Sequence, residues 1–300
     1  MKYKKVLVTG SSGFIGQHLV DELLVQGHRV VGLDIYATFS PQKKRYQFLQ
    51  GNVELKQLRR IPFRPDWIFH CAGGGTVGFA ETDPQRDFQM NVGTSLEVLS
   101  FARNLNPPPR IVYLSSAAVY GNTGSKRHRE RSHARPCSSY GFHKKMAESA
   151  FHFYAKRWAI PSVVVRIFSV YGEGLTKQVF WDAARKLRAG KSTFSGSGKE
   201  TRDFIHIHDV CRFLVNSVKR ASIVSPTFNC GWGKAITIQT ALTLLAKNLG
   251  AKRPRFTGKP RKGDPQHLVA DHSRAKKTGW RPSVLFIEGI RRYAEWVKHH

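Results

Sequence analysis

The feature that most constrains this sequence is a glycine-rich loop near its start, Gly10-Ser-Ser-Gly-Phe-Ile-Gly16. The apolar run Val6-Leu-Val8 precedes it, and apolar residues at helical spacing follow it as far as Gly27. A second apolar run, 29–33, leads directly into Asp34. Glycines at this spacing allow a tight turn and let the backbone approach a pyrophosphate at the N-terminus of the helix. The order strand, glycine loop, helix, strand and acid predicts a dinucleotide-binding unit.

Asp34 also indicates which dinucleotide the unit takes. An acidic residue that closes the second strand can accept hydrogen bonds from the ribose hydroxyls of the adenosine. The same carboxylate would repel a 2′-phosphate, so we expect NAD as the cofactor. The basic residues Lys43, Lys44 and Arg45 follow nearby and leave NADP as an alternative.

The rest of the chain continues the α/β alternation. We expect strands at 47–53, 66–73, 110–116 and 162–168, with helices over 87–104 and 140–157. This pattern predicts an α/β fold of the Rossmann type, with a doubly wound parallel sheet. Beyond Tyr171-Gly172 the character changes: a helix at 178–189 and a polar, glycine-rich stretch at 196–200 predict a smaller substrate-binding region. The expected domains are 1–170, to which the chain returns near 204–222, and 171–300.

Tyr140 and Lys144 form a candidate proton-transfer pair. They are four residues apart in a run that reads as a helix, so their side chains share one face. A neighbouring cation favours the phenolate form of tyrosine, so we expect the pKa of Tyr140 to be lowered. Ser116 ends a predicted strand, at the edge where open α/β sheets bind ligands. A chance helical pair and an ordinary turn serine are the alternatives.

Charge and cysteine content limit the partners and the compartment. The 49 Lys and Arg residues against 20 Asp and Glu give a net charge of +29, which favours anionic partners or reflects a generally cationic surface. No apolar run approaches the roughly 18 residues that a membrane span needs. We therefore expect no membrane contact, and we do not expect nucleic acid as a partner. No metal-like spacing relates the cysteines Cys71, Cys137, Cys211 and Cys230, so we expect no bound metal and free thiols in a reducing compartment, which indicates the cytoplasm.

Taken together, the motifs identify a family. Over essentially its whole length the chain resembles the extended short-chain dehydrogenase/reductases, in the nucleotide-sugar epimerase/dehydratase branch typified by UDP-glucose 4-epimerase. The stretches that carry the resemblance are Thr9–Gly16, Leu33-Asp34, His70–Gly73, Asn91–Thr94, Ser115–Gly121, Tyr140–Lys144, Arg166–Gly172, Arg202–Asp209, Phe228–Gly231 and Arg261–Asp264.

The resemblance implies a mechanism. Ser116, Tyr140 and Lys144 would form the catalytic triad, with Ser116 orienting the oxygen on which Tyr140 acts. Tyr140 would remove a proton from a sugar hydroxyl while the hydride on the same carbon passes to NAD. In a 4-epimerase the 4-keto sugar then rotates and takes the hydride back on its other face. A homodimer through the helices 87–104 and 140–157 is also implied.

The resemblance also assigns binding residues. The cofactor residues would be Gly10, Gly13, Phe14, Ile15, Gly16, Asp34, Asn52, Val53, Cys71, Ala72, Gly73, Asn91, Tyr140 and Lys144. The substrate, a nucleoside diphosphate sugar, would contact Ser116, Ser169, Gln178, Val179, Phe194, Arg202, Arg261 and Asp264.

Among the substrate residues, Arg202 and Arg261 would pair with the pyrophosphate. Phe194 would pack on the base, and Asp264 would reach the ribose. The alternatives are a local ion pair of Arg202 with Asp203 and an ordinary core position for Phe194.

Departures from the family pattern decide between its branches. Ala117 and Ala118 stand where dehydratases carry acidic residues, which argues against elimination of water. A 4-epimerase remains, with an NAD(P)-dependent reductase of 4-keto-6-deoxysugars as the alternative. Asn52 replaces the usual Asp near the adenine, and Ser169 replaces the usual Asn at the substrate phosphate.

The basic segment 126–135 lies between Ser116 and Tyr140 in the sequence. We therefore expect it to border the sugar pocket and to favour a substrate with extra negative charge, such as a UDP-uronic acid. A non-catalytic protein that uses this charge to bind nucleic acid is a further reading, against which the intact Ser116, Tyr140 and Lys144 argue.

Overall fold

The computed structural model describes residues 3–37, 44–124, 127–258 and 266–300. The chain forms two compact units. The first comprises Met1–Val119, Ser138–Arg166 and Cys211–Phe228, and the second comprises Tyr120–Cys137, Ile167–Val210 and Asn229–His300. Residues 120–137 therefore group with the second unit although the flanking segments belong to the first. Among the described helices, none has the length and apolar character needed to cross a bilayer.

The first unit is built on a seven-stranded sheet in the order β11-β6-β5-β4-β1-β2-β3. Along the run β5-β4-β1-β2-β3, each strand pairs in parallel with its neighbour. Leu7 of β1 lies opposite Val31 of β2 on one side and Ile68 of β4 on the other. The Rossmann-type fold predicted from the sequence is thereby confirmed. The strands are β1 (Lys5–Thr9), β2 (Arg29–Asp34), β3 (Tyr46–Gln50), β4 (Trp67–His70), β5 (Arg110–Ser116), β6 (Ser162–Ile167) and β11 (Thr227–Cys230).

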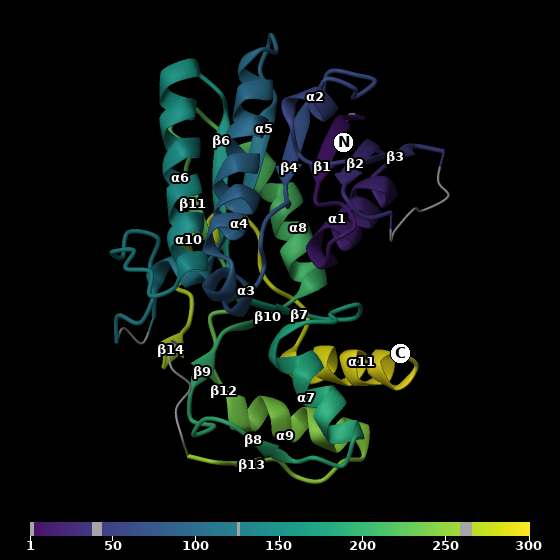
Figure 1. Cartoon of the computed structure of the whole chain (residues 1–300), viewed down its shortest axis with the longest axis vertical. Coiled ribbons are helices and arrows are strands. Elements are labelled where there is room, and N and C mark those ends of the chain that lie inside the picture. Colours follow the sequence, from purple (N-terminus) through teal and green to yellow (C-terminus); the bar gives the residue numbers. More distant parts are fainter. Residues whose placement is uncertain (1–2, 38–43, 125–126, 259–265) are drawn as a thin grey trace. The chain divides into compact units, whose positions relative to one another are not determined.

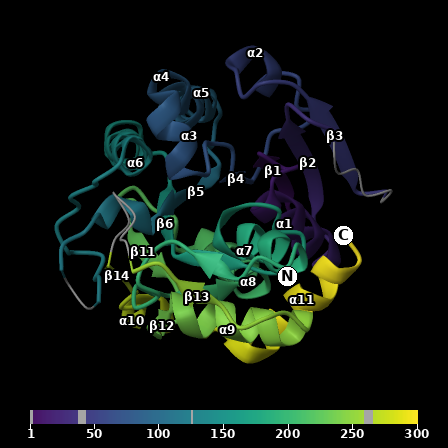
Figure 2. The same ribbon diagram turned by 60° about the horizontal axis from the view of Figure 1, so that its bottom comes forward.

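Helices cover both faces of this sheet, which is why its central strands are apolar on both sides. Figure 2 shows α4, α5 and α6 over one face and α1 over the other. Leu7, Ile111, Val164 and Phe151 belong to the core between the sheet and the helices. The helices of this unit are α1 (Phe14–Val25), α2 (Leu55–Leu58), α3 (Val77–Thr82), α4 (Pro84–Phe88), α5 (Thr94–Arg103) and α6 (Ser139–Trp158); α8 (Ile207–Ser217) leads into it.

The single helix predicted over 87–104 is wrong in detail. Helix α4 starts after the N-cap Asp83 and passes into a π-helical turn, Gln89–Gly93, before α5 begins. Two hydroxyls at the start of α5 bond backward to the main chain of this turn: Thr94 Oγ1 donates to Met90 O and Ser95 Oγ to Asn91 O, both at 2.6 Å. Such side-chain bonds compete with the regular helical ladder. Turns of this kind are frequent at functional sites, and this one contains Asn91.

In the described part of the second unit, small sheets of two or three strands lie among further helices (Figure 1). An aromatic cluster that includes Tyr171, Phe180, Phe204 and Phe286 packs them together. The strands are β7 (Ser169–Tyr171), β8 (Thr193–Phe194), β9 (Thr201–Arg202), β10 (Phe204–His206), β12 (Ile236–Thr237), β13 (Arg255–Phe256) and β14 (His267–Leu268). The helices are α7 (Gln178–Arg188), α9 (Ile238–Leu249), α10 (Ser273–Lys276) and α11 (Phe286–Lys298).

Asp203 holds several segments of the second unit together. Its carboxylate is fully buried and accepts hydrogen bonds from three backbone N–H groups, those of Trp232 at 2.7 Å, Gly233 at 2.8 Å and Ala270 at 3.0 Å. Burial raises the pKa of Asp203 to about 6, while the three N–H groups oppose this rise. Residues 232, 233 and 270 are thus fixed by one side chain to the chain between β9 and β10.

We expect Asp203→Asn to lower the free energy of unfolding by about 2–3 kcal/mol, because an amide nitrogen must then face an N–H group. Urea unfolding followed by circular dichroism measures the change. Asp182→Asn, on the exposed surface of α7, is the matched control and should leave the midpoint unchanged. Equal midpoints for the two variants would contradict the role assigned to Asp203.

Candidate active site

The first unit brings the three candidate catalytic residues to one end of its sheet. Ser116 is the last residue of β5, and Tyr140 and Lys144 occupy the first turns of α6. Helix α6 begins here because the Ser138 side chain accepts the Gly141 N–H at 3.1 Å. Lys144 Nζ donates to Leu114 O at 3.0 Å and lies 6.0 Å from the ring centroid of Tyr140.

The electrostatics of the pair differ from the prediction. Burial raises the pKa of Tyr140 to about 12, and a hydrogen bond with Ser116 opposes the rise. The expected lowering by Lys144 is not seen for these side chains taken alone, because desolvation dominates and the charge of Asp87 adds to the rise. Burial also lowers the pKa of Lys144 to about 8, against the opposing charge of Asp87. At neutral pH Lys144 is therefore protonated and positively charged. Tyr140 keeps its proton unless a further positive charge lowers its pKa.

The glycine loop has the shape that a dinucleotide requires. A side chain at Gly10, where φ is +68°, would place its Cβ 2.6 Å from Ala72 N, and one at Gly16 would overlap Gly10 O. Gly13 is the N-cap of α1 and provides no side-chain cap for its first turn, which contains Phe14 and Ile15. The loop therefore presents uncapped backbone N–H groups to a pyrophosphate. These residues fit NAD.

The acidic end of β2 completes this half of the cofactor site. Asp34 Oδ2 accepts the Ser12 N–H at 2.9 Å, which ties the glycine loop to the strand end. Asn52, exposed, and Val53, buried, follow the adjacent strand β3. Arg45 Nη1 donates to Gly27 O at 2.8 Å. Lys43 lies outside the described residues.

The end of β4 leads to the catalytic residues. Cys71, Ala72 and Gly73 follow this strand, and a Cβ on Gly73 would lie 2.6 Å from Asn91 Oδ1 and 3.2 Å from Lys144 Nζ. Within the described part of the chain, Asn91 Oδ1 is a buried acceptor without a hydrogen-bond partner. Such an atom fits a hydroxyl of a bound cofactor. Burial raises the pKa of the Cys71 thiol to about 12, so the thiol is protonated at neutral pH.

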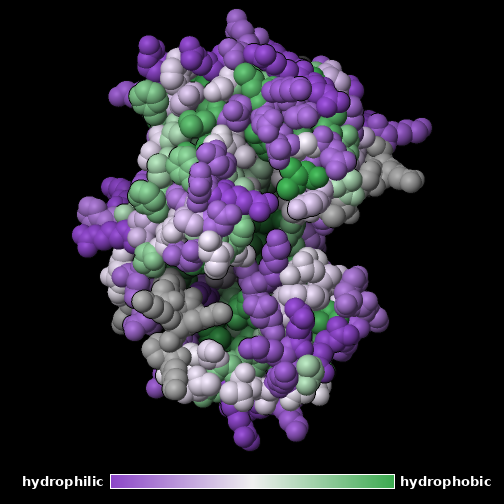
Figure 3. Space-filling view, viewed as in Figure 1, coloured by the Kyte–Doolittle hydropathy of each residue, from purple (hydrophilic) through white to green (hydrophobic). Residues whose placement is uncertain are grey.

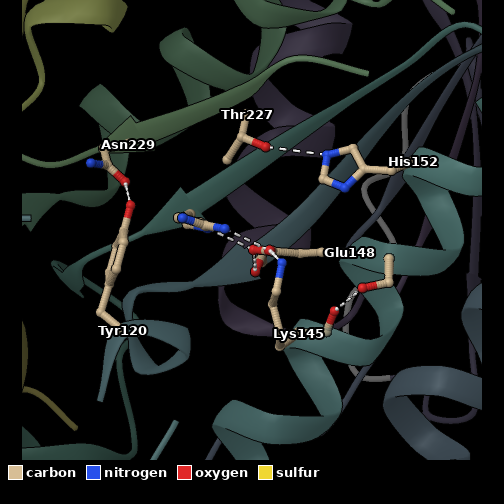
Figure 4. A network of polar contacts seen from close by, with 9 residues as sticks. Tyr120, Lys145, Glu148, His152, Thr227 and Asn229 are labelled. Carbon is tan, nitrogen blue, oxygen red and sulfur yellow. Dashed lines mark hydrogen bonds and ion pairs between the residues drawn. The ribbon is translucent and has the colours of Figure 1, made fainter. Parts of the chain in front are cut away.

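The sequence reasoning missed a buried ion-pair network on α6. The carboxylate of Glu148 receives Arg166 Nε at 2.8 Å and Nη2 at 2.7 Å, and Ser115 Oγ at 2.7 Å. Figure 4 shows Glu148 with Lys145 beside it, and His152 pointing to Thr227. Because Ser115 precedes Ser116 and Glu148 follows Lys144 by one turn, the network fixes α6 to the end of β5. No spacing in the sequence signals this network, because Glu148 and its partner Arg166 are 18 residues apart.

A second missed group is Asp87, buried with His143 and Asn91. His143 Nδ1 lies 2.7 Å from Asp87 Oδ2, and Asn91 Nδ2 donates to Asp87 Oδ1 at 3.0 Å. His143 lies between Tyr140 and Lys144 in the sequence. The separation of 56 residues between Asp87 and His143 gave no local signal.

The candidate substrate residues that the structure describes lie in the second unit, except Ser116. Ser169 begins β7, Gln178 and Val179 begin α7, and Gln178 has φ of +65°, a conformation rare for a residue with a side chain. The Phe194 ring packs 6.2 Å from that of Phe256, and its surface is 8% exposed. Arg202, in β9, donates to Thr201 O at 3.0 Å. Arg261 and Asp264 lie outside the described residues.

Next to β8 the second unit has a basic cavity of about 800 Å³. Its lining includes Ser192, Ser197 and the exposed side chains of Lys252, Arg253 and Arg255. The other basic segment of this unit, 127–135, is anchored by His128, whose N–H donates to Val269 O at 2.8 Å, and by the Arg129–Asp271 pair at 3.1 Å. The second unit thus carries much of the positive charge that an anionic ligand would meet.

Known proteins resemble this chain both in sequence and in structure. A putative UDP-glucose 4-epimerase of Methanocaldococcus jannaschii is 26% identical over 98% of this chain and 99% of its own. Two solved structures, each 27% identical over 98% of this chain and 99% of theirs, superpose with TM-scores of 0.90 and 0.88. They are UDP-glucose 4-epimerase of Thermotoga maritima with UDP-glucose, and UDP-glucuronic acid 4-epimerase of Bacillus cereus with UDP-glucuronic acid and NAD.

The sequence profile that describes the NAD dependent epimerase/dehydratase family matches residues 6–231. The match extends from β1, through the glycine loop and the Ser116, Tyr140 and Lys144 positions, to the end of β11. The chain belongs to the NAD dependent epimerase/dehydratase family, as an enzyme of the extended short-chain dehydrogenase/reductase type.

Proposed function

We propose that the protein is an NAD-dependent 4-epimerase of nucleoside diphosphate sugars, a UDP-hexose or a UDP-uronic acid. The observation that carries the proposal is the combination of a Ser–Tyr–Lys site with alanines at 117 and 118, next to Ser116. A site without a carboxylic acid at these positions suits reversible oxidation rather than elimination. The relatives named above, all 4-epimerases by name, support the same reaction.

The side chains have separate tasks in the proposed reaction. NAD, when bound, supplies the acceptor for a hydride and a positive ring. Tyr140 removes the proton of the C4 hydroxyl and later returns one, so it acts as both base and acid. Lys144, protonated below pH 8, keeps a positive charge near this phenol. Ser116 holds the sugar oxygen in line with Tyr140 through its hydroxyl.

For the nucleotide we propose the second unit. Arg202 and Arg261 would neutralise the pyrophosphate, Phe194 would pack on the base, and Asp264 would bind the ribose. Ser169, Gln178 and Val179 complete the proposed set. The left-handed backbone at Gln178 supports this placement, because strain of this kind is concentrated at binding sites.

We also propose a homodimer through α5 and α6. These helices expose three large apolar side chains, Leu96 at 39%, Phe142 at 55% and Phe153 at 59%. On the face that Figure 3 shows, hydrophilic residues cover much of the surface and apolar residues form patches among them.

The reaction can be tested with purified protein and a panel of UDP-sugars. Without added cofactor, the C4 configuration followed by NMR should reach equilibrium from either epimer, and no net NADH should be consumed. A requirement for stoichiometric NAD(P)H would contradict the epimerase and indicate a keto-sugar reductase. No conversion of any sugar in the panel would also contradict the proposal.

The charge of the second unit predicts the preferred sugar. We expect kcat/KM for UDP-glucuronate to exceed that for UDP-glucose by about tenfold at low ionic strength, because a uronate adds a negative charge in a strongly positive field. The advantage should shrink as salt is added, since salt screens such attraction. Equal kcat/KM values at low salt would remove the uronic acid from the proposal.

A further inference from the structure

Asp87 is the centre of a buried polar cluster in which only Asn91 has an assigned role. It lies at the end of α4, next to the π-helical turn, and is 0% exposed. Its carboxylate receives His143 Nδ1 at 2.7 Å on one oxygen and Asn91 Nδ2 at 3.0 Å on the other. Asn91 is 1% exposed and His143 8% exposed. Two helices and the turn between β4 and α3 meet at this point.

These contacts determine which way the Asn91 amide points. An ionised carboxylate only accepts hydrogen bonds, so the Asn91 nitrogen must face Asp87. The same nitrogen also donates to Asp87 O at 3.0 Å, so both of its hydrogens are engaged. Asn91 Oδ1 is therefore directed to the opposite side, where a Cβ on Gly73 would approach both this oxygen and Lys144 Nζ.

The packing around the cluster allows little adjustment. A Cβ at Gly74 would overlap Asp87 Oδ1, so the backbone at this glycine lies directly on the carboxylate. On the other side the His143 ring meets Phe88 edge-on, with 5.6 Å between the centroids. The Asp87 carboxylate is held by His143, by Asn91 and by the backbone at Gly74, so it can keep the Asn91 amide in one orientation.

We propose that Asp87, held by His143, is a positioning residue that orients Asn91 so that its amide oxygen accepts a hydrogen bond from a hydroxyl of the bound dinucleotide beside Lys144. The inference rests on the proposed function only in taking NAD as the ligand. Asp87 acts through Asn91 and does not itself touch the ligand.

Asp87 also affects the charge of Lys144, and the test must separate this effect from the orientation of Asn91. Its charge raises the pKa of Lys144, against the burial that lowers it to about 8. The remaining titratable groups around Lys144 are Tyr140, His143 and Glu148 on α6, Tyr113 on β5, and His70 and Cys71 at the end of β4. Affinities should therefore be measured at about pH 6, where the lysine is protonated.

The experiment is a double-mutant cycle on NAD affinity, measured by calorimetry with the full chain after removal of bound nucleotide. We expect Asp87→Ala to weaken NAD binding about tenfold, and Asn91→Ala by a similar factor. In the Asn91→Ala background, the Asp87 substitution should change the Kd by less than about twofold, because its effect passes through the amide. Where Asp87→Ala does not fold, Asp87→Val removes the same acceptor and keeps more of the buried volume.

A matched control is the His206–Glu173 pair of the second unit, which joins a buried imidazole to a carboxylate at 3.0 Å. Glu173→Ala should lower the melting temperature and leave the Kd for NAD within about twofold. An unchanged Kd for NAD in the Asp87 variants would overturn the inference. So would an Asp87 substitution that weakens NAD binding equally in the original chain and in the Asn91→Ala background. Because the readout needs no sugar, the cycle can succeed even if every sugar in the panel is left unconverted.

Discussion

Replacing Tyr140 by phenylalanine is expected to lower kcat for C4 epimerisation by about 10³-fold, the size of contribution typical of a general acid and base. The substitution removes one oxygen and keeps the buried ring in place, so the fold should not change. The phenol is the only group of the proposed triad that can take the sugar proton directly. Lys144 carries its own proton below pH 8, and the Ser116 hydroxyl is not an effective base.

Measuring NAD affinity distinguishes a variant that has lost the chemical step from one that has lost the binding site. In the Tyr140→Phe variant the Kd for NAD should stay within about threefold of the original value, because only one of the assigned cofactor residues changes, and Lys144, Asn91 and the glycine loop are retained. Tyr154→Phe on the same helix is the matched control, since its ring packs on Trp158 at 4.3 Å and has no proposed catalytic role. Epimerase activity above about a tenth of the original in Tyr140→Phe would refute the assignment.

Replacing Glu148 by alanine is expected to lower the free energy of unfolding of the first unit by about 3–5 kcal/mol. The substitution leaves Arg166, which is 4% exposed, as a charge without its carboxylate. Burial alone would raise the pKa of Glu148, but the hydrogen bonds from Arg166 and Ser115 lower it overall. The stabilisation is therefore fully present above the ordinary pKa of a glutamate and is lost as the pH falls through the lowered value.

Thermal unfolding at neutral pH measures this effect, with an expected fall in Tm of roughly 10 °C. Glu288→Ala on α11 is the matched control: it breaks an exposed pair with Arg291 at 2.8 Å and should leave Tm unchanged. Glu148→Gln tests the charge separately, because it keeps most of the volume. A Tm for Glu148→Ala equal to that of the control would show that the buried network does not stabilise the fold.

The two substitutions affect the same helix in different ways. Tyr140 lies in the first turn of α6 and Glu148 two turns further on. Loss of the phenol should change the rate and leave stability intact, whereas loss of the carboxylate should change stability first. Any loss of activity in Glu148→Ala should then reflect a displaced Ser116 or Lys144, because the network joins α6 to β5 through Ser115.

Local sequence patterns determined the first βαβ unit and the pairing of Tyr140 with Lys144 on one helix face. The spacing of Gly10 and Gly16 between two apolar runs predicted the first βαβ unit, because a turn and a helix N-terminus depend on neighbouring residues. The four-residue separation placed Tyr140 and Lys144 on one face of α6 for the same reason. The family resemblance then added roles for Ser116 and the second unit, several of which remain predictions.

Tertiary structure decided the features that depend on burial and on distant partners. The direction of the Tyr140 pKa shift could not be read from the sequence, since the Lys144 spacing is visible there but the desolvation of the phenol is not. The π-helical turn at 89–93 and the pairing of Asp87 with His143 arise from contacts that no short window contains. Periodicity specifies which residues share a face, and only the folded chain specifies which charges lose their water and which partners replace it.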